Sequence, residues 1–301
     1  MIEPEETAAV VALVRRGDRR WHHYADLIET RGSAIAVLHG DYEDPREVDS
    51  LTLFEDEPSP EVEVPDLAPI VEEVNAWRDQ ELQLLTVLDP EYPANLRSIH
   101  NRPPLLFVKG ELEPRDEDAI AVVGTRKPTP DAEEAAREMA GGIADAGFTV
   151  TSGLAQGIDR AAHEGALARG GRTVAVIGTG LHKRYPPANA ELQERLGREA
   201  AVLSQFWPDA PPTRHSFLMR NVVMSGFALA TVVIEAAEKS GAKSQARHAL
   251  EHGRPVFLFE SLLENEWARE YAERPGTHVV STADEVLRMI ERLVSVDTLS
   301  V

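Results

Sequence analysis

Three observations in the sequence predict an α/β protein with a doubly wound, mainly parallel sheet and a small N-terminal helical module. First, three short uncharged runs rich in β-branched residues each break into glycine, at residues 119–123, 148–151 and 173–177. Second, helical sequence separates these runs, which is typical of parallel strands buried on both faces. Third, strands and helices continue to alternate towards the C-terminus, as in sheets built with right-handed crossovers.

The amino-acid composition limits the classes of protein to which this chain can belong. With 301 residues, 43% of them hydrophobic, the chain is long enough for one large domain or for a domain plus a smaller module. It has no run of about 18 apolar residues, and its N-terminus is acidic where a signal peptide would be basic and then apolar. We therefore expect a cytoplasmic protein without a membrane partner. The chain has no cysteine, and its ten histidines show no metal-ligand spacing, so we expect no metal and no cofactor.

The net charge of -20 is unevenly distributed. Residues 1–118 carry 28 Asp and Glu against 11 Lys and Arg, which gives -17, whereas the rest of the chain carries 23 against 20, which gives -3. Several basic residues of the second part lie close in sequence, and these are His182, Lys183, Arg184, Arg195, Arg198, Arg214, His215 and Arg220. They form either a local basic surface, which would attract an anionic ligand, or ordinary solvated charges on separate elements. Both interpretations stay open.

The chain divides into two predicted parts. Residues 1–66 are a helical module followed by an acidic linker, and residues 67–301 are the main domain, with its core at 119–260. Apolar residues at helical spacing between residues 7 and 39 predict the helices. Four arginines there, Arg15, Arg16, Arg19 and Arg20, would suit a nucleic-acid backbone, but a solvated edge of packed helices is the preferred interpretation. Residues 40–66 are acidic and contain proline, which favours a flexible linker.

Strand and helix patterns continue through the main domain. We expect a helix at 67–80 and strands at 82–87 and 105–110, which lead onto the main sheet. The first crossover helix has Thr129 as its N-cap and Pro130 at its first position, and Gly147 closes it. The second runs from Gly157 to Gly170. Later strands are expected at 201–204, 231–235, 255–259 and 278–280, with helices near 190–198, 221–229, 243–252 and 284–293, the last with Thr282 and Glu285 placed as a capping box.

Three glycine-rich loops follow the first three core strands. The carboxyl ends of parallel strands form the ligand-binding edge of such a sheet, so the loops are expected to meet there. Backbone N–H groups and helix N-termini at this edge favour an anion. No loop is a standard cofactor motif, because G-x-x-x-x-G-K-[ST] is absent and G-x-G-x-x-G does not follow the first strand.

The loops carry ordered motifs that resemble those of the DNA-processing protein A family, also called the Smf family. They are G-[ST]-R at residues 124–126, S-G-x-A-x-G-I-D-x-x-A-H at 152–163 and G-x-G-x-x-x-x-Y-P-x-x-N at 178–189. Tyr92-Pro93 and residues 103–110 resemble the family's lead-in, and Arg220-Asn221, Glu235-Ala236 and Ser240-Gly241 continue the pattern. The similarity covers about residues 88–260.

The resemblance implies an extended Rossmann-like domain that binds single-stranded DNA, forms a homodimer and helps to load a RecA-type recombinase during DNA uptake, recombination or repair, without being an enzyme. It implies that the first two loops contact phosphate and that further polar residues line the same groove. The residues expected to bind DNA or phosphate are Gly124, Thr125, Arg126, Lys127, Ser152, Gly153, Gly157, Lys183, Arg184, Asn221 and Lys243. Base stacking would use Phe206, Trp207 or Phe217.

Three further residues near the expected site have alternative interpretations. Asp159 and His163 lie four residues apart on one helix face, which suits catalysis or a metal. A structural role is preferred, with Asp159 holding loop N–H groups and His163 hydrogen-bonded beneath it. Glu235 ends a strand at the ligand-binding edge, where it would either bind ribose hydroxyls or pair with Arg126.

The sequence also departs from the family pattern. The usual R-N-R is Arg220-Asn221-Val222 here, which removes a cation, and the usual S-E is Ser204-Gln205. The lost cation and the acidic charge favour a rival function, a nucleotide-binding sensor or a nucleotide-processing enzyme on a related scaffold. Against this rival, no P-G-G-x-G-T-x-x-E motif precedes Glu235. A scaffold that binds only protein partners is a third alternative.

Overall fold

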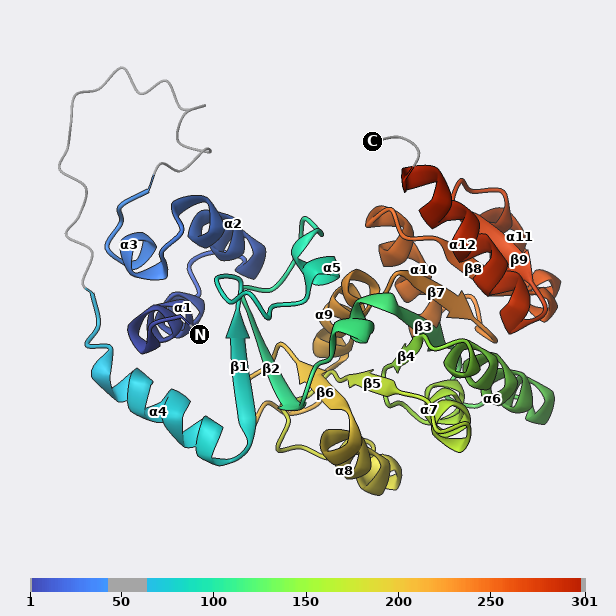
Figure 1. Cartoon of the computed structure of the whole chain (residues 1–301), viewed down its shortest axis with the longest axis horizontal. Helices are drawn as coiled ribbons and strands as arrows, with labels where there is room; N and C mark the ends of the chain where they lie inside the picture. Colours follow the sequence, from blue (N-terminus) through green and yellow to red (C-terminus); the bar gives the residue numbers. More distant parts are fainter. Residues whose placement is uncertain (1, 43–63, 299–301) are drawn as a thin grey trace, which may run out of the picture. The chain divides into compact units, whose positions relative to one another are not determined.

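The structure is a computed structural model that describes residues 2–42 and 64–298 (Figure 1). Most of the predicted acidic linker lies outside the described residues. Contacts divide the chain into two units, Met1–Tyr92 with His100–Leu106, and Pro93–Ile99 with Phe107–Val301. Residues 67–92 thus fall in one unit with the N-terminal helices, whereas the sequence predicts that they belong to the main domain. The domain boundary after residue 66 stays a prediction.

The first unit is helical at its N-terminus, as predicted. It comprises α1 (Pro4–Arg16), α2 (Trp21–Arg31), α3 (Ala34–Leu38), α4 (Ala68–Asp79) and β1 (Leu82–Thr86). Gly17 and Gly32 end the first two helices in the left-handed region, at φ 69° and 70°, where a side chain would be strained. Arg15 pairs with Glu73 of α4, and Arg16 donates to the Leu38 carbonyl. These contacts support the interpretation of a packed helical edge.

The second unit contains the main sheet. Its strands are β2 (Leu105–Gly110), whose first two residues belong to the first unit, β3 (Ala119–Val123), β4 (Thr149–Ser152), β5 (Thr173–Val176), β6 (Ala201–Ser204), β7 (Ala230–Val233), β8 (Val256–Phe259) and β9 (Thr277–Val280). Its α-helices are α5 (Ala94–Arg97), α6 (Pro130–Asp145), α7 (Ile158–Ala168), α8 (Ala190–Glu199), α9 (Arg214–Phe227), α10 (Gly241–Glu251), α11 (Glu266–Ala272) and α12 (Ala283–Thr298). Short 3-10 helices are η1 (Pro114–Asp118), η2 (Pro187–Asn189) and η3 (Glu260–Glu264).

The strand order in this unit is β2-β6-β5-β4-β3-β7-β8-β9. All neighbouring pairs from β6 to β9 are parallel, and β2 is antiparallel to β6, with Phe107 opposite Ser204. The predicted doubly wound, mainly parallel sheet is therefore confirmed. The chain moves from β3 to β6 in one direction and returns to place β7 on the other side of β3. Ligands bind at such a reversal point in open α/β sheets, so the ends of β3 and β7 mark the position to inspect.

Helices cover both faces of this sheet (Figure 1). On one face, α6, α7 and α12 share a core with the strands, which includes Ile120, Val122, Ile143 and Val150, all fully buried. The helix pair α9 and α10 lies on the other face (Figure 1). Helices α6 and α7 approach closely because Gly165 lacks a side chain, and a Cβ there would lie 2.4 Å from the Arg137 carbonyl oxygen. The glycine in α7 thus permits this packing.

Some predicted helix boundaries were wrong. The helix expected at 221–229 begins at Arg214, because the Thr213 hydroxyl accepts from the Ser216 N–H and the Ser216 hydroxyl accepts from the Thr213 N–H. Helices α5 and α11 were not predicted. The predicted capping box at the last helix is half formed. The Thr282 hydroxyl accepts from the Glu285 N–H at 3.4 Å, whereas the Glu285 carboxylate accepts from the Ser281 N–H at 2.7 Å and not from Thr282.

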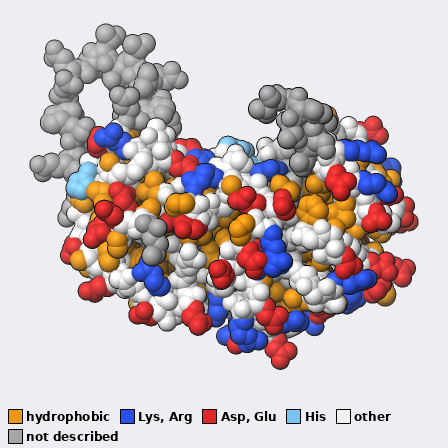
Figure 2. All heavy atoms as spheres, viewed as in Figure 1, with side chains coloured by type: hydrophobic (Ala, Val, Ile, Leu, Met, Phe, Trp, Pro, Cys, Tyr) orange, Lys and Arg blue, Asp and Glu red, His pale blue; other side chains and the backbone are white. Residues whose placement is uncertain are grey.

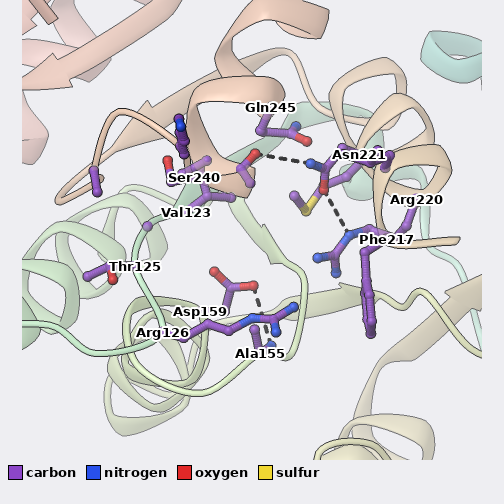
Figure 3. Close-up of a pocket in the computed structure, with 17 residues that line it drawn as sticks. Val123, Thr125, Arg126, Ala155, Asp159, Phe217, Arg220, Asn221, Ser240 and Gln245 are labelled. Carbon is purple, nitrogen blue, oxygen red and sulfur yellow. Dashed lines mark hydrogen bonds between the residues drawn. The ribbon is translucent and has the colours of Figure 1, made fainter. Parts of the chain in front are cut away.

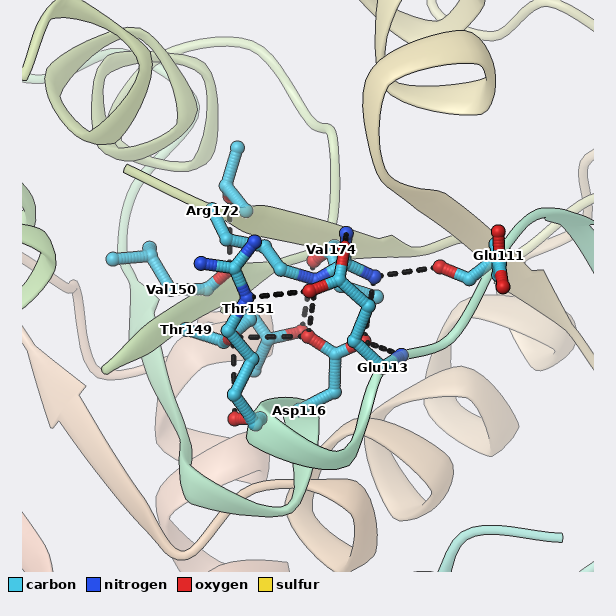
Figure 4. A network of polar contacts seen from close by, with 10 residues as sticks. Glu111, Glu113, Asp116, Thr149, Val150, Thr151, Arg172 and Val174 are labelled. Atoms are coloured by element: carbon cyan, nitrogen blue, oxygen red, sulfur yellow. Dashed lines mark hydrogen bonds and ion pairs between the residues drawn. The ribbon is translucent and has the colours of Figure 1, made fainter. Parts of the chain in front are cut away.

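A buried ion pair joins the starts of two core strands (Figure 4). Arg172, directly before β5, donates to both carboxylate oxygens of Asp116 in η1, at 2.6 and 2.7 Å. The Thr149 hydroxyl at the start of β4 donates to the same carboxylate at 2.9 Å. Arg172 also donates to Glu113 and to the Glu111 carbonyl, so its three nitrogens are all used. The network holds the connection between β2 and β3 against the amino ends of β4 and β5.

Removing one partner of this ion pair should destabilise the fold. Asp116→Ala leaves a buried guanidinium without its carboxylate, and we expect the free energy of unfolding to fall by about 3–5 kcal/mol. Urea unfolding followed by circular dichroism measures it. The control Glu113→Gln alters a half-exposed partner of the same arginine and should cost about 1 kcal/mol or less. Equal effects of the two substitutions would contradict a dominant role for the buried pair.

Candidate functional site

A pocket of about 380 Å³ lies where the ends of β3 and β7 meet. Its walls come from the loop after β3, the start of α7, the middle of α9 and the N-terminal end of α10. Figure 3 shows the side chains of Arg126, Asp159 and Arg220 facing the same cavity. The predicted ligand-binding edge is therefore hollowed at the reversal point of the sheet.

A smaller pocket, of about 50 Å³, adjoins the first and is lined by the second and third glycine loops. Arg126 and Phe217 line both pockets. The Arg126 guanidinium lies 5.2 Å from the centre of the Phe217 ring, and the Tyr185 ring lies 5.7 Å beyond it, tilted by 36°. Within the described residues no carboxylate pairs with Arg126. Tyr185 lines the smaller pocket and not the larger one. We call these three side chains the aromatic ridge, because together they combine a cation with two ring faces.

The first glycine loop is fixed by contacts inside the protein. The Thr125 N–H donates to the Glu235 carbonyl at 2.7 Å, and the Ile158 N–H donates to the Thr125 carbonyl at 3.2 Å. A Cβ at Gly124 would lie 2.9 Å from the Glu235 carbonyl oxygen and closer still to Ile158. The glycine is therefore required by the close approach of β3, β7 and α7.

The second glycine loop is fixed in the same way. The Ser152 hydroxyl donates to the Val122 carbonyl at 2.6 Å. Asn189 donates to the carbonyls of Leu154 and Ala155 at 2.9 and 3.0 Å. Gly157 has a φ of 77°, and a Cβ there would lie 2.5 Å from a carbonyl oxygen of the first loop. The contacts leave the loop little freedom to rearrange around a ligand.

The Asp159 carboxyl group is hydrogen-bonded to backbone N–H groups of both glycine loops. Its carboxylate is 4% exposed, accepts from the Ala155 N–H at 3.4 Å and also accepts from the Gly124 N–H. Burial raises its pKa, and the nearby Arg220 charge and the two amides oppose that rise. The structural role of Asp159 stays a prediction with which these contacts agree. One of its two amide donors belongs to Gly124, which the resemblance assigned to phosphate.

Arg220 ties the carboxyl ends of β4 and β5 together. Its Nη1 donates to the carbonyls of Gly153 and Val176, at 2.6 and 2.7 Å, and its Nε donates to the Asn221 side chain at 3.1 Å. The side chain is 6% exposed, and burial lowers its pKa. A Cβ at Gly153 would lie 2.0 Å from this guanidinium. Gly153 is therefore needed to admit the arginine.

His163 lies fully buried behind the loops. Its Nδ1 is 2.7 Å from the Thr173 hydroxyl, which itself donates to the Val150 carbonyl. The histidine must therefore donate through Nδ1–H, and its Nε2 has no partner within the described residues. Burial, with the nearby Arg220 charge, lowers its pKa to about 3. His163 is therefore neutral near pH 7, and its structural role stays a prediction.

Most of the basic residues near residue 190 are paired with acids. Lys183 lies 3.6 Å from Asp209, and Arg184 lies 3.0 Å from Glu194. Arg195 and Arg198 also pair with glutamates of α8. On the face drawn in Figure 2, Lys and Arg are interspersed with Asp and Glu. The interpretation as ordinary solvated charges describes these residues better than a shared basic surface.

The structure brings together part of the expected set of binding residues. Gly124, Thr125, Arg126 and Asn221 line the larger pocket, and Gly153 lines the smaller one. The expected residues that line neither pocket are Lys127, Ser152, Gly157, Lys183, Arg184 and Lys243. Lys243 instead pairs with Glu238 and lies over the rings of Trp267 and Tyr271.

Two cations that line the pocket were absent from the expected binding set. Arg220 was named among the nearby basic residues and in the family motif Arg220-Asn221, but not as a binding residue. Lys239, which follows β7, was not named. The sequence contained one indication that Lys239 lies at the site. This residue directly precedes Ser240-Gly241, where a helix starts after a core strand. Val222, where the family pattern has a cation, lines neither pocket.

Glu235 also has partners inside the protein. Its carboxylate accepts from the Thr129 N–H at 2.9 Å, next to the start of α6, and within the described residues it forms no ion pair with Arg126. The described side chains contain no cluster of three potential metal ligands. No described helix is both long and apolar enough to cross a membrane.

Sequence comparisons point to one family. The model of the DNA recombination-mediator protein A family matches residues 83–291. Protein Smf of Synechocystis sp. is 41% identical over 58% of this chain and 45% of its own length, so this chain spans less than half of that relative. DNA processing protein DprA of Streptococcus pneumoniae is 36% identical over 70% of this chain and 76% of its own length.

Two solved structures agree with the sequence relatives. DNA processing protein A from S. pneumoniae superposes with a TM-score of 0.65 at 33% identity, covering 74% of this chain and 80% of that one. The Helicobacter pylori protein superposes with a TM-score of 0.62 at 25% identity, covering 71% and 96%. That second structure concerns the single-stranded DNA binding mode of the H. pylori protein.

The buried neutral His163 should make stability depend on pH. Its folded-state pKa of about 3 lies below the ordinary value of 6.5, so the unfolded chain binds more protons between these values and stability is lost as the pH falls through them. From pH 7.5 to pH 5, this residue should cost about 2 kcal/mol of unfolding free energy. In His163→Gln, urea unfolding should show a pH difference smaller by that amount. An unchanged difference would contradict the assignment.

Proposed function

The chain belongs to the DNA recombination-mediator protein A family, and we propose that it binds single-stranded DNA at the pocket between the ends of β3 and β7. The observation that carries the proposal is the aromatic ridge of Arg126, Phe217 and Tyr185. Proteins that bind single strands without sequence preference combine cations for the backbone with aromatic faces for the bases. The ridge offers both within a few ångströms.

The charge that faces the pocket supports an anionic ligand. Arg126, Arg220 and Lys239 line it, against the single carboxylate of Asp159. The net charge of -20 on the whole chain therefore does not describe the local field. A single-stranded nucleic acid can place one phosphate in such a small cationic pocket. The affinity of the protein for that nucleic acid should therefore depend on the salt concentration.

Within this proposal the protein acts in the cytoplasm during DNA uptake, recombination or repair and assists a RecA-type recombinase, as a homodimer. The support is the family description as a recombination mediator, together with the motif resemblance. We propose binding without catalysis. The two residues with catalytic spacing are held inside the protein, Asp159 by loop amides and His163 by the Thr173 hydroxyl.

A free nucleotide is the second candidate ligand. The observation that favours it is the size of the larger pocket, since about 380 Å³ falls within the usual range for small-molecule sites. A nucleotide would then stabilise the protein against heat, whereas oligonucleotides would not.

Arg126 should account for part of the salt dependence of DNA binding. We expect Arg126→Ala to weaken binding of a labelled oligothymidylate about tenfold at low salt, because a charge-assisted phosphate contact and the cation of the ridge are lost. The slope of log affinity against log salt concentration should fall by about 0.7 for the one contact. Fluorescence anisotropy over a salt series measures both quantities.

The matched control is Arg198→Ala, which removes an arginine from the surface of α8. It should leave both affinity and slope near those of the wild type. If the wild type shows no salt-sensitive binding to oligonucleotides but is stabilised by nucleotides, the second candidate replaces the first.

Phe217 should contribute through its ring face. Phe217→Leu retains an apolar side chain without the π surface, and we expect it to weaken oligonucleotide binding by about 1–3 kcal/mol, or roughly 5- to 150-fold. Phe217→Tyr retains the ring and should bind like the wild type in the same anisotropy assay. Equal affinities of the leucine and tyrosine variants would exclude stacking at this position.

A further inference from the structure

We propose that the N-terminal end of α10, with Lys239 and Arg220, forms the subsite for a DNA phosphate, on the wall of the pocket formed by α9 and α10. This inference rests on the proposed DNA binding. It moves the phosphate away from the two glycine loops, where the motif resemblance had placed it. The ligand chemistry is the oxyanion of a phosphodiester.

The glycine loops are poorly suited to a second anion. The N–H groups of Gly124 and Ala155 already donate to the Asp159 carboxylate, and the Thr125 N–H donates to a backbone carbonyl. A phosphate placed on these three amides would find them occupied and would lie beside the Asp159 carboxyl group. Both effects oppose binding at that wall.

The α10 wall has unused donors. This helix of 11 residues begins at Gly241, and the hydroxyl of its Ser240 cap accepts from the Lys243 N–H. Within the described residues, the N–H groups of Gly241 and Ala242 have no acceptor, and both residues line the pocket. Free amides at a helix start carry the positive end of the helix dipole, which favours a phosphate.

A buried cation points to the same place. Arg220 lines the pocket while only 6% exposed, and its Nε and Nη1 are hydrogen-bonded. Its Nη2 has no acceptor within the part of the chain that the structure describes. Asn221 accepts from Arg220 and donates to the Gly241 carbonyl at 3.1 Å, as Figure 3 shows. The amide thereby holds the guanidinium and the start of α10 in a fixed relation, and Lys239 adds a charge beside them.

Gly241 permits a test at the level of a single N–H group. Proline is tolerated at the first helical position, Ser240 before it is extended at φ -112° and ψ 154°, and nothing lies within 4 Å of a Cβ at this glycine. Gly241→Pro removes the N–H, whereas Gly241→Ala retains it. With labelled oligothymidylate, we expect the alanine variant to bind like the wild type and the proline variant to bind about fivefold more weakly.

Lys239→Gln tests the charge in the same assay. We expect about fivefold weaker binding at low salt and a salt slope smaller by about 0.7, with Arg198→Gln unchanged as the matched control. Circular dichroism confirms that each variant is folded. If wild-type protein binds but Lys239→Gln keeps its slope, or if Gly241→Pro binds like Gly241→Ala, the subsite is refuted while DNA binding stands. If wild-type protein does not bind, the proposed function fails instead.

Discussion

The pocket depends on the buried guanidinium of Arg220. Two strands that end side by side present their last carbonyls to the same space, and these carbonyls would be costly to leave without donors. Arg220 supplies the donors from the opposite helix layer, to Gly153 and Val176. The same side chain brings a positive charge to the pocket. Arg220 therefore both satisfies the carbonyls at the strand ends and makes the local electrostatic potential more positive.

The glycine motifs have a different meaning in the folded chain from their usual one. Gly124, Gly153 and Gly157 are each required because another part of the protein approaches the backbone too closely for a Cβ. The loops they form enclose the carboxyl group of Asp159, which accepts hydrogen bonds from their amides. The surface left for a ligand is then built by Arg126, Phe217 and the start of α10, which belong to three different elements.

The core strands and the N-cap at Thr129 were predictable from the sequence. Burial on both faces and helix capping each depend on residues that are close together in the chain. The position of Lys239 was not predictable, since it depends on β7 pairing beside β3, more than a hundred residues earlier in the chain. Lys243 was expected in the groove from the family resemblance. Its side chain lies over Trp267 and Tyr271 of α11, a helix that was not predicted. Tertiary contacts of this kind decide which face a charged side chain takes.

Arginines hold β4 and β5 at both ends, Arg172 with Asp116 at the amino ends and Arg220 at the carboxyl ends. Such pinned strands resist local opening, and their amide hydrogens should be among the slowest in the protein to exchange with solvent. The part of the sheet that supports the aromatic ridge is therefore ordered before single-stranded DNA binds. Most of the conformational entropy lost on association is then lost by the flexible nucleic acid, and little is lost by the protein.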